Sequence, residues 1–101
     1  MDQLNALQAA LTVVERRFGP MPLAHVIAFL HVALEEGRGV GHYARQTNTH
    51  RSVMSRRLQG LDDRLLIEVR GTGRLDGQKE IFLTERGRQL VREMSHLLGC
   101  L

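Results

Sequence analysis

Polar side chains recur at helical spacing near the middle of the chain, in residues 41–61 (GHYARQTNTHRSVMSRRLQGL). Met54, Leu58 and Leu61 stand at i, i+4 and i+7, which predicts the buried face of a helix over about 50–62. The polar positions of this helix are the candidate ligand contacts: His50, Arg51, Ser52, Ser55, Arg56 and Gln59. Guanidinium groups bind phosphates and the major-groove edge of guanine, and small hydroxyls suit the same partners. The chemistry that this face favours is therefore DNA binding.

A shorter helix is expected just before it, over about 42–47, with Tyr43 and Ala44 buried. Asn48 stands where the chain must turn sharply, and Asn tolerates the left-handed backbone conformation. A small Ala44, a turn residue Asn48 and an apolar Met54 fit two crossing helices, as in a helix-turn-helix. The alternative is an ordinary helix pair, because any small helical protein contains helices joined by a turn.

Positive charge is concentrated in this part of the chain. Residues 45–74 hold seven arginines against Asp62, Asp63 and Glu68, a net charge of +4. The whole chain has a net charge of +3, so the other 71 residues carry a net charge of −1. A localised basic region is typical of nucleic-acid binding. A solvated basic face without a partner is the alternative interpretation.

Length and composition predict one soluble globular domain over 1–101, because 43% of the 101 residues are apolar and 25% are charged. No run of about 18 apolar residues exists, and the N-terminus does not resemble a secretion signal. We therefore expect a cytoplasmic protein without a membrane partner. Cys100 is the only cysteine, which excludes an intrachain disulfide and leaves an intermolecular disulfide or redox switch open.

Catalytic and metal-binding patterns are not evident. The five histidines lack the spacing of metal ligands, so no metal site and no cofactor are predicted. The sequence contains no nucleophile elbow, phosphate-binding loop or paired-carboxylate arrangement. We therefore expect a protein that is not an enzyme.

Long helices with regular apolar stripes are predicted at both ends, over about 2–18 and 84–98, with Thr84 as the N-cap of the second. A domain of this length has little interior for both stripes in addition to a central helix over 22–36. We therefore predict that one or both stripes pack between two copies of the chain. For the stripe over 2–18, packing in the domain's own core is the default interpretation. The predicted dimer contacts are Leu4, Leu7, Leu11, Val14, Leu90, Met94, Leu97 and Leu101.

The central helix is expected to be covered on most sides, because apolar residues surround it. One face is predicted to hold Leu23, Val26, Ile27, Leu30 and Leu34, and Phe29 and Val32 lie on another. Val40, which stands between two glycines, could form a very short strand, with Gly41 then capping the following helix.

A β-hairpin is predicted over about 65–83. Alternation places Leu65, Ile67 and Val69 inward on the first strand, and Ile81 and Leu83 inward on the second. The turn region between them offers two further candidate DNA contacts, Arg74 and Lys79. Arginine is favoured in a narrow minor groove by its negative potential. An ordinary solvated hairpin is the alternative.

This order of elements resembles a winged helix-turn-helix of the MarR type, the multiple-antibiotic-resistance regulators. The resemblance covers roughly residues 22–98. Its most specific residues are THRSVMSRRLQGLDDRLLIEVR (49–70), Asp76-Gly77 in the wing, and Leu83-Thr84-Glu85-Arg86-Gly87. It implies a mainly α fold with a small β-hairpin (α+β) and a homodimer, held by its first and last helices, on pseudo-palindromic DNA. It also implies that Arg51, Ser52, Ser55 and Arg56 face the major groove, with Arg74 at the wing.

The chain departs from the usual family pattern at several positions. It has Asn48 where a glycine is usual, Thr47 and Arg57 where apolar residues are usual, and Gln78 and Lys79 where a wing arginine follows Asp-Gly. Family members are commonly longer, and the extra helix length forms the dimer lobe and a ligand crevice. No small-molecule effector pocket is therefore predicted.

The residues and the resemblance together predict a sequence-specific double-stranded DNA-binding transcriptional regulator, a homodimeric repressor. The helix over about 50–62 would occupy the major groove, and the wing over about 71–79 would contact the minor groove or the backbone. The alternative is a winged-helix protein-protein interaction module without specific DNA binding. Thr47 and Arg57 leave room for it, because they weaken the apolar pattern of the helix pair.

Overall fold

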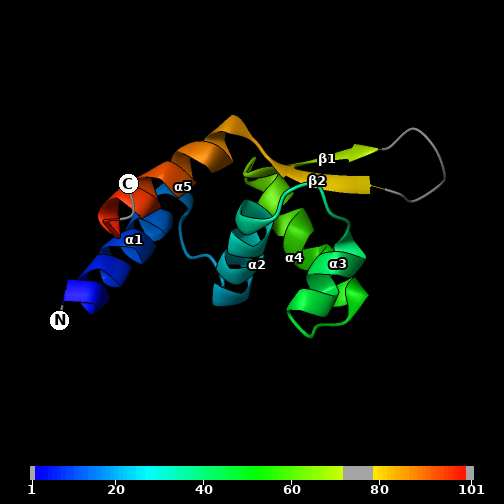
Figure 1. The fold of residues 1–101 in the computed structure, drawn as a ribbon, viewed down its shortest axis with the longest axis horizontal. Helices are drawn as coiled ribbons and strands as arrows, with labels where there is room; N and C mark the ends of the chain where they lie inside the picture. The colour runs from blue at the N-terminus through cyan, green and yellow to red at the C-terminus, as the bar shows by residue number, and fades with distance from the viewer. Residues whose placement is uncertain (1, 72–78, 100–101) are drawn as a thin grey trace.

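The computed structural model describes residues 2–71 and 79–99. They form five helices and an antiparallel two-stranded hairpin, which confirms the predicted fold class. The elements are, in chain order, α1 (Asp2–Phe18), α2 (Leu23–Leu34), α3 (Val40–Gln46), α4 (Arg51–Asp63), β1 (Ile67–Gly71), β2 (Lys79–Leu83) and α5 (Glu85–Leu97). The molecule is elongated, with extents of 48 × 25 × 22 Å. Figure 1 shows α1 beside α5 at one end, and α3, α4 and the hairpin at the other.

One apolar core runs through the molecule, because each helix turns at least one apolar residue inward. Phe29 of α2 and Tyr43 of α3 are its largest aromatic members, with 2% and 1% of their surface exposed. The Tyr43 hydroxyl donates a hydrogen bond to the Glu35 carbonyl oxygen at 2.5 Å, so the polar end of this buried ring has a partner. The predicted inward face of α4 is confirmed, because Met54, Leu58 and Leu61 are all buried.

The segment before α3 differs from the prediction. Val40 is the first residue of α3 rather than a short strand, and Gly39, not Gly41, is its N-cap. The residue that pairs with the hairpin is Arg38, whose carbonyl oxygen accepts a hydrogen bond from the Ile81 amide at 2.9 Å. The Gly37 amide donates to the Ile81 carbonyl oxygen at 2.8 Å. The strand-like contact therefore lies two residues earlier than predicted.

The first strand of the hairpin begins later than predicted. Leu65 has a left-handed backbone (φ 61) and is 60% exposed, whereas Leu66 is fully buried. Leu65 follows the C-cap of α4 and points outward, so the prediction for Leu65 was wrong, and Leu66 and Ile67 are buried one after the other. Val69 is also exposed, at 45%, because the hairpin projects beyond the helices (Figure 1). Ile67, Ile81 and Leu83 face inward as predicted.

The orientation of α2 is the largest correction. Its buried residues are Val26, Ala28, Phe29 and Val32, which pack toward α4 and β2. The other apolar residues of the predicted face are exposed: Leu23 at 64%, Ile27 at 42%, Leu30 at 38% and Leu34 at 85%. When apolar residues surround a helix, its sequence does not indicate which side faces the core. The central helix is therefore covered on one side rather than on most sides.

The start of α5 is locked against the hairpin and α2. The Thr84 hydroxyl caps α5 by accepting from the Gly87 amide at 3.0 Å, as predicted. A Cβ on Gly87 would lie 2.2 Å from the Leu66 carbonyl oxygen, so only glycine fits this crossing. Glu36 Oε1 accepts from the Leu83 amide at 2.8 Å and from Arg88 Nη2 at 3.0 Å. This one carboxylate therefore joins the segment that follows α2 to both β2 and α5.

Among the described residues, none of the helices is by itself long and apolar enough to span a membrane. Only α1 and α2 taken together meet that criterion, and the pair is bent by 104° at its break.

Candidate nucleic-acid interface

α3 and α4 form a helix pair with a tight turn between them. Asn48 has φ 52, the left-handed conformation predicted from its type. The Thr47 hydroxyl donates to the Tyr43 carbonyl oxygen at 2.8 Å and lies 2.8 Å from the Thr49 hydroxyl. The Thr49 amide donates to the Ala44 carbonyl oxygen at 2.9 Å. A threonine at position 47 thus satisfies its hydroxyl within the turn instead of leaving it unpaired.

The first residue of the predicted contact set, His50, is the N-cap of α4. Its Nδ1 accepts a hydrogen bond from the Ser52 amide at 3.2 Å and lies 2.8 Å from the Ser52 hydroxyl oxygen. To accept from an amide, Nδ1 must be unprotonated, which places the proton of the neutral ring on Nε2. His50 therefore stabilises the start of α4 and presents Nε2 as its remaining donor.

The predicted contact residues of α4 share one exposed face. Exposed positions are His50, Arg51, Ser52, Ser55, Arg56 and Gln59. Gln59 Nε2 donates to Asp63 Oδ1 at 3.0 Å, so its amide is partly engaged on its own helix. Arg57 lies at the edge, half-buried, where the family pattern has an apolar residue. α4 therefore combines a buried apolar face with an exposed polar and basic one.

The arginines of the chain fall into two groups by their ion pairs. Five are paired with a glutamate: Arg17 with Glu93, Arg38 with Glu35, Arg70 with Glu68, Arg88 with Glu36 and Arg92 with Glu85. Within residues 2–71 and 79–99, seven arginines form no ion pair. Four lie on α3 and α4, namely Arg45, Arg51, Arg56 and Arg57, and the other three are Arg16 on α1, Arg64 at the C-cap of α4 and Arg86 on α5. Residues 37–61 contain no aspartate or glutamate at all. The four arginines of α3 and α4 therefore have no carboxylate partner in the described part of the chain, and the two acids of the helix pair, Asp62 and Asp63, stand at the far end of α4.

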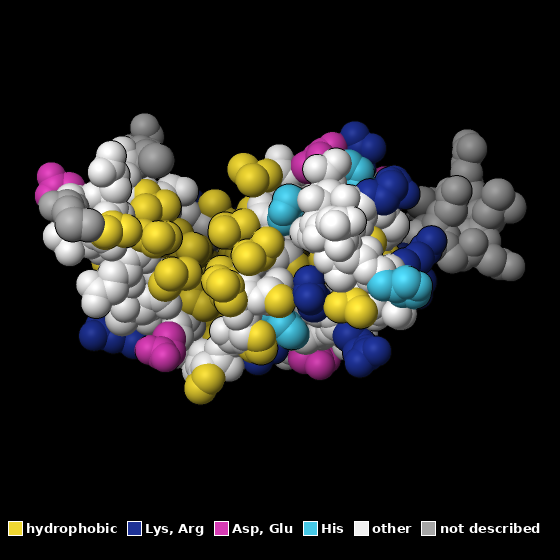
Figure 2. All heavy atoms as spheres, turned by 90° about the horizontal axis from the view of Figure 1, so that it is seen from below, with side chains coloured by type: hydrophobic (Ala, Val, Ile, Leu, Met, Phe, Trp, Pro, Cys, Tyr) yellow, Lys and Arg dark blue, Asp and Glu magenta, His cyan; other side chains and the backbone are white. Residues whose placement is uncertain are grey.

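The surface view shows the same division. Figure 2 shows basic side chains mostly on the part of the molecule nearer the hairpin, and apolar side chains over α1 and α2. Uncompensated charge near a helix pair of this geometry raises the local concentration of an anionic partner. The arrangement suits a polyanion better than a small neutral ligand.

Only part of the predicted wing contact is described. Lys79 is exposed at the start of β2, and Arg74 lies outside the described residues, as does Gln78. The hairpin pairs Ile67 with Leu83 and Gly71 with Lys79. The Arg70 guanidinium stacks over the Phe82 ring at 4.2 Å from its centroid, besides its pairing with Glu68. Arg70 is thus held on the hairpin itself.

The predicted dimer contacts divide between the core and the surface. Val14, Leu90 and Met94 are buried within one chain, because α1 and α5 pack against each other, and so offer no surface to a second copy. Leu4 and Leu7 are exposed, at 54% and 46%. Leu11 and Leu97 are half-buried, and Leu101 lies outside the described residues, as does Cys100. Val14, Leu90 and Met94 therefore belong to the core of the single chain, and among these residues only Leu4, Leu7, Leu11 and Leu97 have surface that a second copy could contact.

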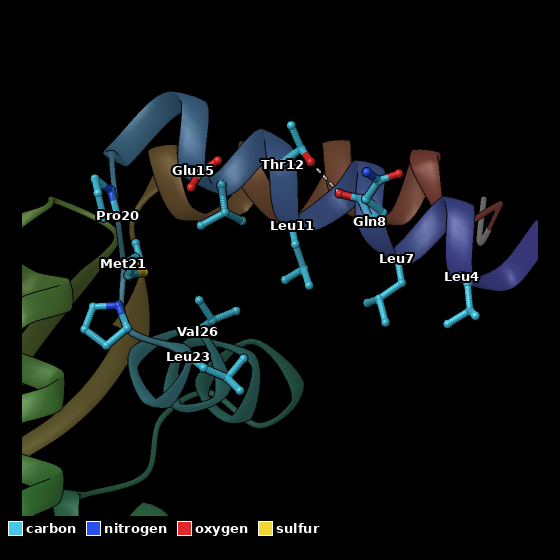
Figure 3. A pocket seen from close by; sticks show the side chains of 12 residues that line it. Leu4, Leu7, Gln8, Leu11, Thr12, Glu15, Pro20, Met21, Leu23 and Val26 are labelled. Atoms are coloured by element: carbon cyan, nitrogen blue, oxygen red, sulfur yellow. Dashed lines mark hydrogen bonds between the residues drawn. The ribbon is translucent and has the colours of Figure 1, made fainter.

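An apolar groove of about 760 Å³, which we did not predict, lies in the angle between α1 and α2. Figure 3 shows Leu4, Leu7 and Leu11 of α1 on one side and Leu23 and Val26 of α2 on the other. The Pro20–Pro22 segment closes the corner. Proline cannot continue a helix interior, so Pro20 and Pro22 separate α1 from α2, whereas the exposed side of α2 depends on how the helices pack.

His25 of α2 faces α4. Its Nδ1 is buried without a hydrogen-bond partner among the described residues, and a Cβ on Gly60 would lie 2.6 Å from its Nε2. Burial lowers the pKa of His25, and the positive charges of Arg64 and Arg57 lower it further. Gly60 therefore makes room for a histidine that favours its neutral form. The described residues contain no cluster of metal-ligating side chains.

No protein-family model matches the sequence, and no curated protein matches it closely enough to count as a relative. Solved structures do match the fold. A MarR-like transcriptional regulator from Thermotoga maritima has a TM-score of 0.72 and 21% identity, over 99% of this chain and 77% of that one. A MarR/EmrR family transcriptional regulator from Acinetobacter sp. ADP1 has a TM-score of 0.69 and 22% identity, over 93% and 69%. A MarR transcriptional regulator from Methanosarcina mazei Go1 has a TM-score of 0.71 and 14% identity, over 94% and 70%.

These three neighbours are transcriptional regulators, not enzymes. At such identities the likeness concerns the fold, and it extends over nearly the whole of this chain, including the helix pair, the hairpin and both terminal helices. The chain has the winged-helix fold of the MarR-type transcriptional regulators.

Proposed function

We propose that the protein is a sequence-specific double-stranded DNA-binding transcriptional regulator, a homodimeric repressor that occludes a promoter. In this proposal α4 enters the major groove, and the hairpin contacts the minor groove or the backbone. The observation that carries the proposal is the group of arginines on α3 and α4 that form no ion pair within the described chain. They lie on a fold whose solved neighbours include transcriptional regulators.

The direct test is a fluorescence-anisotropy titration with DNA from upstream of the protein's own gene and with a scrambled duplex, at two salt concentrations. Both duplexes should bind more weakly at high salt, because phosphate contacts release counterions. The upstream duplex should bind at least about a thousandfold more tightly than the scrambled one. Absence of binding to either duplex at low salt would refute the proposal.

The homodimer part of the proposal is supported by the exposed apolar residues of α1. Leu4 and Leu7 extend the α1 stripe beyond the part that α5 covers. Two copies related by a two-fold axis would place their α4 helices on half-sites roughly 34–36 Å apart. In a two-fold contact the same patch of both copies is used, so one substitution alters the interface twice.

Leu7→Asp should therefore shift the protein from dimer to monomer, because it places a charge in an apolar contact. Sedimentation velocity over a range of protein concentrations measures this, with a dissociation constant raised at least about tenfold as the expected result. Asn5→Asp, an exposed polar position on the same helix, is the matched control and should remain dimeric. A Leu7→Asp variant that dimerises like the wild-type protein would exclude α1 from the interface.

The second candidate function is a winged-helix protein-interaction module. The α1–α2 groove favours it, because a contiguous apolar surface of this kind is typical of an interaction site. Tight binding of a protein partner, without salt-sensitive DNA binding, would distinguish this function from the first.

A further inference from the structure

Two arginines from different helices meet beside Gly41. Arg45 lies in the last turn of α3, and Arg51 is the first residue of α4. Arg45 Nη1 lies 3.4 Å, and Arg51 Nη1 lies 3.7 Å, from the point that a Cβ on Gly41 would occupy. The turn between the helices thus brings two cations to one place, which the sequence spacing alone did not indicate.

This pair has no anion of its own in the described part of the chain. Neither arginine forms an ion pair or a side-chain hydrogen bond with residues 2–71 or 79–99. Two neighbouring guanidinium groups repel each other unless an anion lies between them. A phosphate has several acceptor oxygens and matches the forked donors of two arginines. The chemistry of the pair therefore points to a phosphate.

The position of the pair distinguishes it from the rest of the exposed face. In a helix-turn-helix the first helix crosses the DNA backbone, and base edges are contacted by residues near the N-terminus of the second helix. Arg51 begins the second helix, so the direction of its side chain decides which of the two it contacts. Arg51 Nη1 lies over the first turn of α3, at Gly41, rather than over the middle of α4. Arg56 lies more than one helical turn further along α4 and is exposed. The two α4 arginines are therefore placed for different partners.

We infer that Arg45 and Arg51 together bind one phosphate of the DNA backbone, and that Arg56, not Arg51, is the α4 arginine that contacts bases. The inference rests on the proposed DNA binding and sharpens it. Arg45 becomes a contact residue that sequence analysis did not select.

The test compares Arg45→Ala, Arg51→Ala, the double variant and Arg56→Ala on the upstream and scrambled duplexes. Arg45→Ala and Arg51→Ala should each weaken binding to both duplexes by the same factor, because a phosphate carries no sequence information. The double variant should lower the slope of log affinity against log salt by about 1, the value for one lost phosphate contact. Arg56→Ala should weaken mainly the upstream duplex.

Three results would overturn the inference: an Arg51→Ala effect confined to the upstream duplex, an Arg45→Ala variant with wild-type affinity, or a double-variant slope change of about 2. If the wild-type protein binds neither duplex at low salt, the proposed function and this inference fail together. If the wild-type protein binds and only these variant results differ, the inference alone fails.

Gly41 offers a second test that leaves both arginines in place. Gly41→Glu should put a carboxylate beside the two guanidinium groups, and so replace the phosphate by an internal ion pair. Binding to both duplexes should fall as far as in the double variant. Gly41→Ala adds only a methyl at ordinary contact distance and should keep wild-type affinity.

Both substitutions suit the first turn of α3, where a negative charge favours the helix and alanine is a better helix former than glycine. Thermal melting of the two variants should therefore match or exceed that of the wild-type protein. Equal DNA affinity of Gly41→Glu and Gly41→Ala would exclude a phosphate at this place.

Discussion

The α3–α4 pair and the α1–α5 pair are both built on buried apolar residues, yet their outer surfaces are opposite in character. On α5, Arg92 is paired with Glu85, and Arg17 of α1 is paired with Glu93 of α5. On α3 and α4 the arginines have no such partner, whereas large exposed apolar residues lie on α1 and α2 and are absent from residues 40–63. Four of the seven described arginines without an ion pair therefore lie on α3 and α4, whereas Arg16 and Arg86 are the two on α1 and α5, so the unpaired charge is concentrated on the α3–α4 pair.

The largest expected effect on stability comes from a substitution in the buried contact between α1 and α5. Leu90→Ala should lower the free energy of unfolding by about 2–5 kcal/mol, because Leu90 is 1% exposed and a cavity would remain. Urea denaturation followed by circular dichroism measures it. Leu34→Ala, on an 85% exposed leucine, is the control and should change stability by no more than about 0.5 kcal/mol. Equal losses in the two variants would contradict the packing described for α5.

The second largest effect is expected on DNA binding, with stability unchanged, from a substitution on the α3–α4 pair. Arg56→Ala should weaken binding to the upstream duplex by about 1–3 kcal/mol if Arg56 contacts a base. Its free energy of unfolding should stay within about 0.5 kcal/mol of wild type, because the side chain is exposed and unpaired in the described chain. Arg16→Ala, an exposed arginine on α1, is the matched control and should bind as wild type does. Anisotropy and urea denaturation on the same preparations decide the point.

A smaller effect concerns the start of α4. His50→Ala should lower the free energy of unfolding by about 1 kcal/mol, because the Ser52 amide loses its acceptor. His50→Asn keeps a side-chain acceptor at the N-cap and should recover most of that loss. Thermal melting of the two variants provides the measurement. If both variants have the same melting temperature, below that of wild type, the imidazole ring of His50 stabilises the protein by something other than the cap.

The smallest effect is a pH dependence at the junction of α2 and α4. Burial, and then Arg64 and Arg57, lower the pKa of His25, so the unfolded chain binds a proton more readily than the folded one. Stability from this source is present above the ordinary histidine pKa of about 6.5 and is lost as pH falls through the lowered folded pKa. His25→Gln should therefore lose less stability than wild type between pH 7.5 and pH 5.5.

Urea denaturation at the two pH values tests this prediction. His96→Gln, an exposed histidine of α5, is the control. It should keep the pH dependence of the wild-type protein. A His25→Gln variant whose stability falls as steeply as that of wild type would place the proton uptake elsewhere.

Much of the α3–α4 pair could be predicted from sequence, because the determining signals are local. The spacing of Met54, Leu58 and Leu61 sets the inward face of α4, and Asn48 and Thr84 act through their immediate neighbours. The exposed face of α4 then follows from helix geometry alone. Signals of this kind do not depend on what the rest of the chain does.

Other features depend on distant parts of the chain and could not be predicted. Leu65 takes a left-handed conformation and points outward, so Leu66 and Ile67 both face inward and the expected alternation is interrupted. The pairing of Arg17 with Glu93 joins residues 76 positions apart, and that of Arg88 with Glu36 spans 52. Which arginines remain unpaired is therefore a property of the fold, and only the folded chain divides them into two groups.

The Glu36 carboxylate also has a mechanical consequence. One oxygen holds the β2 backbone and the Arg88 side chain, and Arg88 Nη1 in turn donates to the Leu83 carbonyl oxygen at 2.7 Å. A swing of α5 relative to the hairpin would stretch at least one of these bonds, so the junction resists bending in more than one direction. This junction therefore holds α5 at a fixed angle to the hairpin and α4, so in a two-copy assembly its stiffness would keep the distance between the two α4 helices constant.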